Sequence, residues 1–124
     1  MKTRTIAHLV IGFGKAGKTL AADLAKHGES VILVEQSATM YGGTCINIGC
    51  IPSKLLLVEG EKSERLSDKS AAFTAAMQRR EQLTSALRAA NYNKLASIPG
   101  VEVLTGKAHF LSPHVGEVTT ESGV

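Results

Sequence analysis

Short apolar runs and one amphipathic segment open the chain in a strand–helix–strand order. Residues 5–11 are apolar and end in glycines, and Val31–Glu35 is a second apolar run. Both runs are typical of strands that are buried on both faces. Between them, residues 15–27 carry alanine or leucine at every fourth position, which predicts a helix that ends at Gly28. This order predicts a right-handed βαβ unit with two parallel strands.

The middle of the chain is expected to be helical. After a loop over 36–43, the pattern becomes helical from Pro52, and a longer helix is predicted over about 70–95. The apolar positions of that longer helix form one stripe, which is more often a packing face than a partner-binding face. The members of the stripe are Phe73, Ala76, Met77, Leu83, Leu87 and Ala90.

Three short strands are predicted after a turn at 98–100. They cover Val101–Thr105, 107–111 and 115–120, and turn residues separate them. We expect these strands to form a small antiparallel meander. The whole pattern predicts an α/β fold, in which a Rossmann-like βαβ unit with parallel strands is followed by helices and then by the meander, without a closing element.

The composition fits one globular domain. Of the 124 residues, 44% are hydrophobic and 20% are charged, and the mean hydropathy is +0.06, which excludes disordered, collagen-like and coiled-coil classes. The net charge is +3, but Lys and Arg are spread along the chain, so no nucleic-acid partner is expected. No apolar run approaches the ~18 residues of a membrane span, so we expect no membrane partner and a cytoplasmic location.

Residues 12–19 (GFGKAGKT) match two phosphate-binding motifs at once. As G-x-G-x-x-G they predict a dinucleotide site: Gly12 makes a tight turn, Gly14 lets the backbone approach a pyrophosphate, and Gly17 lets the helix pack closely on the strand. The pyrophosphate would lie on the helix N-terminus. This interpretation also requires an acid about 20 residues further on to bind a ribose. Glu35 lies 18 residues after Gly17, at the end of the second strand.

The same residues match the phosphate loop G-x-x-x-x-G-K-[ST] of nucleoside-triphosphate enzymes. In that interpretation Lys18 would bind the β,γ-phosphates, Thr19 would bind Mg²⁺, and a strand would end in a metal-binding aspartate. In the dinucleotide interpretation, by contrast, Lys18 is expected to be a surface residue of the helix. The only aspartates, Asp23 and Asp68, do not end an apolar strand. The pattern therefore favours a dinucleotide, while a phosphate-loop nucleotide-binding module and a bare structural turn stay open as alternatives.

Cys45 and Cys50 lie five positions apart in a glycine-rich segment. On an ideal helix this spacing would put their Cα atoms roughly 8–9 Å apart, whereas a disulfide needs less than ~7 Å. A disulfide would therefore require a distorted helix, for which Gly49 supplies the flexibility. Its thiolates would be favoured by N–H groups at a helix start and by Lys54, as in a catalytic disulfide. Two inert thiols and a zinc site recruiting distant histidines are the alternatives, and we expect no bound metal.

Residues 42–54 (GGTCINIGCIPSK) resemble the redox-disulfide signature of the class I pyridine nucleotide–disulfide oxidoreductases. These flavoproteins include glutathione reductase, dihydrolipoamide dehydrogenase and mercuric reductase. The glycine fingerprint and Glu35 are similar in order and spacing to the FAD-binding unit of that family. The stretches IGFGKAGKTLA and MYGGTCINIGCIP are especially similar to bacterial reactive-chlorine-resistance flavoenzymes, whose members reduce hypothiocyanous acid and are linked to copper.

The resemblance implies roles for individual residues. Cys45 would be the interchange thiol that attacks the substrate, and Cys50 would be the charge-transfer thiol against the flavin. Lys54 would lie near the flavin ring and stabilise its reduced, anionic form. FAD would be held by Gly12, Gly14 and Gly17 at the pyrophosphate, Glu35 at the adenosine ribose, Gly43 and Thr44 along the pyrophosphate and ribityl chain, and Ala108 near the adenine.

Members of this family are several times longer than this chain. They add an NAD(P)H-binding domain and a dimerisation domain, and the latter supplies a His–Glu acid–base pair across a homodimer. No histidine of this chain matches that motif. We therefore expect residues 1–124 to be the N-terminal part of an FAD-binding domain, truncated within the meander and inactive alone.

In the intact enzyme, the resemblance implies that NAD(P)H reduces FAD and that FAD reduces the Cys45–Cys50 disulfide. Cys45 would then pass electrons to a small oxidised substrate, either a molecule or a metal ion. A disulfide, hypothiocyanous acid, Hg²⁺ and Cu²⁺ stay open as substrates, as does the choice between NADH and NADPH, because the other domains determine both. A non-catalytic remnant is the remaining alternative.

Overall fold

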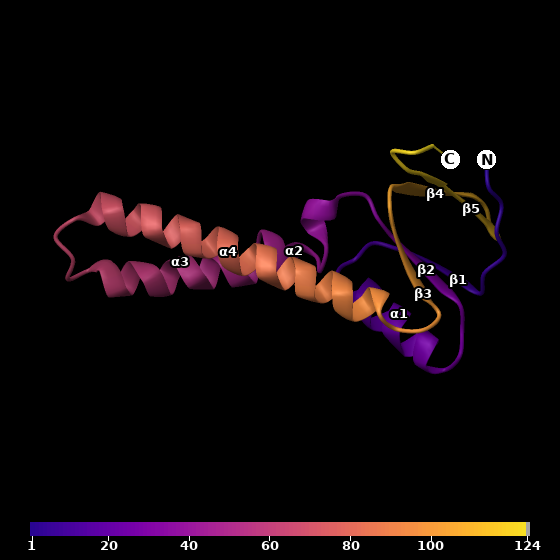
Figure 1. Cartoon of the computed structure of the whole chain (residues 1–124), viewed down its shortest axis with the longest axis horizontal. Helices are drawn as coiled ribbons and strands as arrows, with labels where there is room; N and C mark the ends of the chain where they lie inside the picture. Colours follow the sequence, from indigo (N-terminus) through magenta and orange to yellow (C-terminus); the bar gives the residue numbers. More distant parts are fainter. Residues whose placement is uncertain (124) are drawn as a thin grey trace.

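A parallel sheet, a long helical hairpin and an antiparallel ribbon make up the computed structural model, which describes residues 1–123 (Figure 1). The hairpin projects to one side, away from the sheet and the ribbon. The elements follow one another as β1 (His8–Ile11), α1 (Lys15–Lys26), β2 (Val31–Glu35), η1 (Ala38–Met40), α2 (Thr44–Asn47), α3 (Cys50–Ser63), α4 (Lys69–Ala96), β3 (Val101–Thr105), β4 (Lys107–Ser112) and β5 (Val115–Thr119).

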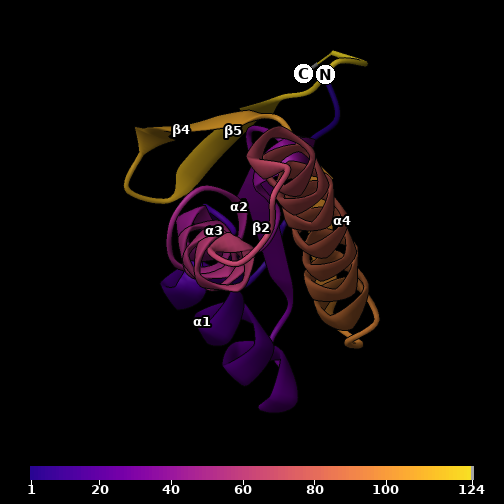
Figure 2. The ribbon, with the colours of Figure 1, turned by 90° about the vertical axis from the view of Figure 1, so that its left-hand side faces the viewer.

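The parallel sheet has the strand order β1-β2-β3, so β2 is central. The βαβ unit is confirmed, because β1 pairs in parallel with β2 and α1 connects them. Val10 of β1 faces α1 at Gly17, whereas its neighbour Leu9 faces the ribbon β4–β5 at Gly116. The sheet therefore lies between α1 and the ribbon (Figures 1 and 2). The buried core cluster is aliphatic around one aromatic ring and contains Phe13, Ala21, Val31, Leu33 and Leu95.

Val101–Thr105 belongs to the parallel sheet, and its predicted place in an antiparallel meander was wrong. β3 pairs in parallel with β2 along the whole of both strands. A hydrogen bond from Val31 N to Gly100 O (2.8 Å) marks the start of this pairing. The helical hairpin supplies the long crossover that a parallel pair requires. After Gly106 the chain leaves the sheet, and only β4 and β5 pair antiparallel.

Helices α3 and α4 lie side by side as an antiparallel hairpin (Figures 1 and 2). α4 spans 28 residues and closely matches the predicted helix. Asp68 caps it by accepting a hydrogen bond from Ala71 N (2.9 Å). The predicted apolar stripe is only partly a packing face, because Ala76 is buried whereas Phe73 is 64% exposed. The far end of α4 has α3 on one side and no second layer among residues 1–123.

The predicted α/β order is otherwise confirmed. The helical region begins earlier than expected, since α2 starts at Thr44 and α3 starts at Cys50 rather than at Pro52. Across residues 1–123, no helix has both the length and the apolar character needed to cross a membrane.

Candidate functional site

Three glycines shape the turn between β1 and α1, which we call the glycine turn (residues 12–17). Gly12 has φ +107°, a backbone conformation that L side chains rarely adopt. A Cβ on Gly17 would lie 2.0 Å from Gly12 O, so only a glycine lets α1 pack this close. The ideal Cβ position of Gly14, by contrast, has no atom within 4 Å. The glycine turn is therefore tight on its protein side and open at Gly14.

The open side of the glycine turn lies at the N-terminus of α1. Gly14 is the N-cap residue and makes no side-chain cap, which leaves the first-turn N–H groups to water or to an anionic ligand. Glu35 reaches the same turn from the end of β2. Its carboxylate accepts hydrogen bonds from Phe13 N (3.0 Å) and from Ser37 N (3.2 Å), which fix its position. A helix N-terminus and an acid at a strand end are the two features that a dinucleotide site combines.

The segment that bears the cysteines, residues 41–50, packs directly on the glycine turn. In this cysteine segment Gly42 and Gly43 are buried and have positive φ, +90° and +94°. A Cβ on Gly43 would lie 2.7 Å from Gly14 Cα. Because neither residue has a side chain, the two backbones can meet, and Thr44 starts α2 beside the glycine turn.

A break between α2 and α3 brings the two cysteines together. Ile48 N and Gly49 N both donate to Thr44 O (2.9 and 2.7 Å), and Cys50 then begins α3. This break is the helix distortion that contact between Cys45 and Cys50 requires. Both cysteines are exposed free thiols in the structure.

The Cys45 thiol influences the ionisation of its neighbour. As a hydrogen-bonding partner it raises the pKa of Cys50 above its ordinary value, and desolvation raises that pKa further. The backbone N–H of Cys50, at the start of α3, lowers the same pKa. The hydrogen bond with Cys45 is the largest of these effects, so its net result is a raised pKa: Cys50 keeps its proton more firmly as long as Cys45 is a free thiol beside it.

The remaining predicted site residues lie at the edges of this region. Lys54 is exposed on α3, one helical turn after Cys50. Ala108 lies in β4, two residues after Gly106, whose N–H donates to Glu35 O (2.9 Å). The structure thus brings the glycine turn, Glu35 and the cysteine segment together, with Lys54 beyond the cysteines and Ala108 on the Glu35 side.

Lys18 is not the surface residue that the dinucleotide interpretation predicted. Its Nζ donates to Gly42 O (3.2 Å) and to Asn91 Oδ1 (2.9 Å). Burial lowers the pKa of Lys18, and repulsion from Lys15 lowers it further. The prediction was wrong because Asn91 lies 73 residues further along the chain, and no local sequence pattern predicts a hydrogen bond between residues so far apart.

An aromatic cluster that the sequence analysis missed supports the same region. The ring centroids of Phe13 and Tyr41 are 5.6 Å apart, and those of Tyr41 and Tyr92 are 4.8 Å apart. These rings join the glycine turn, the cysteine segment and α4. The chain has only three Phe and two Tyr and no Trp, so the scarcity of aromatic residues was the one available signal that they serve particular places.

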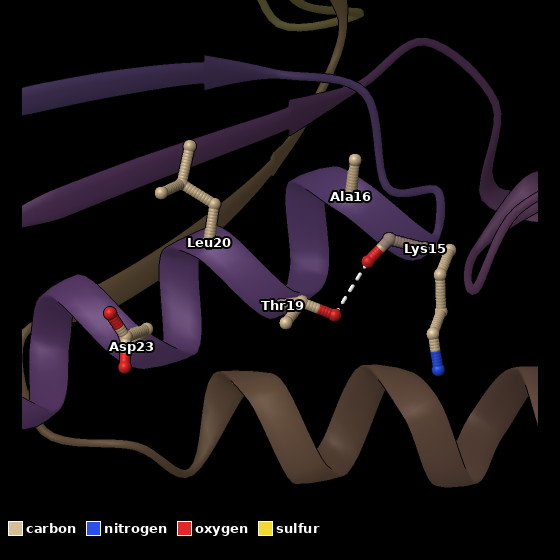
Figure 3. Close-up of a pocket in the computed structure, with 5 residues that line it drawn as sticks. All are labelled: Lys15, Ala16, Thr19, Leu20 and Asp23. Atoms are coloured by element: carbon tan, nitrogen blue, oxygen red, sulfur yellow. Dashed lines mark hydrogen bonds between the residues drawn. The ribbon is translucent and has the colours of Figure 1, made fainter.

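A shallow hollow beside α1 shares Lys15 and Ala16 with the glycine turn but no residue with the cysteine segment (Figure 3). In it, the Thr19 hydroxyl donates to Lys15 O (2.6 Å), one turn earlier on the same helix. No glycine of the turn and no cysteine lines the hollow, so we place the candidate site at the glycine turn and the cysteine segment. The residues that line the hollow are Lys15, Ala16, Thr19, Leu20 and Asp23.

Comparison with known protein families gives a match over nearly the whole chain. The profile described as pyridine nucleotide-disulphide oxidoreductase covers residues 6–122. The chain belongs to the pyridine nucleotide-disulphide oxidoreductase family. The predicted family is therefore confirmed, and its relatives also include glutathione reductases and dihydrolipoamide dehydrogenase.

Two curated relatives illustrate the range of similarity. The probable pyridine nucleotide-disulfide oxidoreductase RclA of Escherichia coli (strain K12) is 47% identical over 106 residues, which cover 86% of this chain and 22% of the relative. The mercuric reductase of Streptomyces lividans is 34% identical over 126 residues, which cover 92% of this chain and 26% of the relative. The chain thus spans about a quarter of the length of these relatives.

Solved structures agree with the fold. The HOCl-induced flavoprotein disulfide reductase RclA from Escherichia coli matches with a TM-score of 0.82 and 44% identity, covering 94% of this chain and 25% of that one. The Cu(II) complex of the same enzyme matches with a TM-score of 0.81 and 46% identity, covering 90% and 24%. These matches confirm the predicted α/β fold, and the relatives are flavoprotein disulfide oxidoreductases.

Proposed function

We propose that this chain is the N-terminal, FAD-binding and redox-active part of a disulfide oxidoreductase. The observation that carries the proposal is the contact between the glycine turn and the cysteine segment, where Gly43 lies against Gly14. This contact would bring a dinucleotide cofactor and the Cys45–Cys50 pair to one place. Electrons would pass from NAD(P)H through FAD to the cysteines and on to a small oxidised substrate, and residues 1–124 alone would not complete this path.

The residues around the glycine turn fit FAD. The open space at Gly14 and the N-terminus of α1 suit a pyrophosphate, and the fixed carboxylate of Glu35 is a suitable acceptor for ribose hydroxyls. Lys54 would place a positive charge near the flavin ring. When bound, FAD would supply two-electron transfer between the nicotinamide and the cysteines. The proposed FAD-binding residues are Gly12, Gly14, Gly17, Glu35, Gly43, Thr44, Lys54 and Ala108.

The two cysteines are proposed to have different roles. Both thiols are exposed, and Cys45 lies in the short helix α2 before the helix break, a position that suits attack on a substrate. Cys50 begins the 14-residue helix α3, whose N-terminal N–H groups favour a thiolate. With a disulfide substrate, the Cys45 sulfur bonds to one substrate sulfur and releases the other half as a thiol. Cys50 then attacks Cys45, which releases the second thiol, so the cysteine pair loses two electrons and the substrate gains them.

The substrate class is proposed from the thiol pair and from the relatives. Adjacent thiols are soft ligands that suit soft metal ions. A mercuric reductase among the relatives and a Cu(II) complex of RclA support Hg²⁺ or Cu²⁺ as one class. A small disulfide and hypothiocyanous acid form the other class. We further propose that the complete enzyme is a homodimer of the cytoplasm.

Titration of the 124-residue chain with FAD, followed by flavin fluorescence, tests the cofactor assignment. We expect binding by the wild-type chain and about tenfold weaker binding by Gly14→Ala, because the new Cβ would occupy space that the pyrophosphate needs. Gly60→Ala is the matched control, since Gly60 is exposed on α3 with no atom within 4 Å of its Cβ position. A chain that binds Mg·ATP but not FAD, and loses that binding in Lys18→Ala, would show that the proposal is wrong.

A further inference from the structure

Lys18 fastens the cysteine segment to two helices. Its ammonium group donates to Gly42 O (3.2 Å), three positions before Cys45, and to Asn91 Oδ1 (2.9 Å) on α4. Asn91 is itself held, because its Nδ2 donates to Leu87 O (2.8 Å) and so turns its Oδ1 toward Lys18. Three elements, α1, α4 and the cysteine segment, therefore meet at one lysine.

Asn47 forms a second attachment on the other side of Cys45. Its Nδ2 donates to Tyr41 O and to Gly43 O (both 2.9 Å), which closes the cysteine segment on itself. Its Oδ1 accepts a hydrogen bond from Arg88 Nε (2.9 Å) of α4. Every polar atom of this side chain is thus used, and its orientation is fixed. We call the four side chains of both attachments the loop clamp: Lys18, Asn47, Arg88 and Asn91.

The two cations of the loop clamp, Lys18 and Arg88, donate hydrogen bonds to neutral acceptors. Neither Lys18 nor Arg88 forms an ion pair within 4.0 Å among residues 1–123, and both side chains are half-buried. Removing a cation from water is unfavourable unless its donors are satisfied, and burial is the main cause that lowers the pKa of Lys18. Hydrogen bonds to neutral acceptors offset this cost rather than exceed it, so we explain the arrangement by the position that it imposes on the cysteine segment.

Both helices that bear the cysteines, α2 and α3, pack on α4 and on each other. Cys50 begins α3, which packs along α4, whereas Cys45 lies in the short helix α2. We propose that the loop clamp holds the Cys45 thiol within bonding reach of Cys50 and thereby stabilises the disulfide between them. The inference rests on the redox role proposed above. The competing explanation is that the turn at Thr44–Gly49 suffices alone.

Equilibration of the 124-residue chain with glutathione buffers measures the stability of this disulfide. The protein dithiol and glutathione disulfide react to give the Cys45–Cys50 disulfide and two molecules of glutathione. Two electrons pass to glutathione disulfide, and the two thiol protons end on the glutathione thiols. Acid quenching, alkylation and mass spectrometry give the equilibrium constant from the fractions of dithiol and disulfide.

We expect Lys18→Met and Arg88→Met each to lower this constant about tenfold, because each loses hydrogen bonds to a charged donor. Lys18→Arg keeps the charge and the hydrogen-bond donors, so its equilibrium constant should stay at the wild-type value. The matched controls are Lys26→Met on α1 and Arg80→Met on α4. Lys26 is exposed, and within residues 1–123 Arg80 pairs only with Glu81 of its own helix, so neither change removes a contact with the cysteine segment. In guanidinium chloride, where the clamp is absent, all variants should give one common constant.

Several results would overturn the inference. Clamp variants with the constant of the wild-type chain would show that the turn alone positions the thiols. An equal fall of the equilibrium constant in the control variants would show a general effect of removing positive charge. A wild-type chain that forms no disulfide would reject the redox role and the clamp together. If Lys18→Met loses its helical circular dichroism, Asn91→Ala removes the same bond from the acceptor side and is measured in its place.

Discussion

Replacement of Gly17 by alanine tests how closely α1 must pack on the glycine turn. The new Cβ would lie 2.0 Å from Gly12 O and 3.2 Å from Gly12 C, with Val10 Cγ1 at 3.4 Å. The two nearest atoms belong to the backbone, so no side-chain rotation relieves the clash. Because Cβ atoms essentially never approach such neighbours within 3.0 Å, α1 would have to move away from the turn by about 1 Å.

The expected result is a loss of about 2 kcal/mol in the free energy of unfolding. Forcing a methyl group into a packed site costs about 1–3 kcal/mol, and a backbone clash of this depth belongs at the upper end. Alanine gains up to about 1 kcal/mol over glycine in a helix, and less in the first turn where Gly17 lies, which offsets part of that cost. In a chain of this size, about 1 kcal/mol lowers Tm by about 4 °C.

Urea and thermal unfolding, followed by far-UV circular dichroism, measure the difference. The control is Gly60→Ala in α3, where the Cβ would meet no atom within 4 Å. There the helix propensity acts alone, so we expect a gain of about 0.5–1 kcal/mol. If Gly17→Ala were as stable as the wild-type chain, or gained stability as Gly60→Ala does, the packing argument would be refuted.

Two further predictions concern ionisation. Cys45→Ala removes the main cause that raises the pKa of Cys50, so iodoacetamide should modify Cys50 at lower pH than in the wild-type chain; an unchanged pH profile in mass spectrometry would contradict this. Arg4 donates two hydrogen bonds to Glu102 (2.5 and 2.9 Å) and lowers the pKa of that carboxyl. A lowered carboxyl pKa stabilises the fold above the unfolded pKa, and this is lost as pH falls through the folded pKa. Between about pH 5 and pH 3, the Tm of the wild-type chain should therefore fall more steeply than the Tm of Arg4→Met. Parallel falls of the two Tm values would exclude a contribution of this pair to stability.

Local periodicity accounts for the part of the fold that was predictable. Val31–Glu35 is apolar at nearly every position because β2 is the central strand and is covered on both faces. β1 begins at His8 rather than at residue 5, because His8 pairs with Val31, the first residue of β2. The helix break at Gly49 was predictable only on the premise that the two cysteines meet, since an undistorted helix would keep them apart.

The rest depends on contacts between segments that are distant in the sequence. The pattern of β3 suits parallel and antiparallel pairing equally, and the choice follows from the hairpin that returns the chain to the free edge of β2. The acceptor of Lys18 lies 73 residues away. The apolar stripe of α4 predicts packing only where a neighbour exists, and Phe73 has none that covers it among residues 1–123.

The structure also separates the two motifs that the glycine turn satisfies. A phosphate loop requires the Lys18 ammonium group on phosphate and the Thr19 hydroxyl on Mg²⁺. Here the ammonium group donates to Gly42 O and Asn91 Oδ1, and the hydroxyl donates to a carbonyl of its own helix. Triphosphate binding would break these bonds, including the one that joins Lys18 of α1 to the cysteine segment. A dinucleotide is bound through backbone N–H groups and would leave these side-chain bonds intact, which favours the dinucleotide interpretation of the glycine turn.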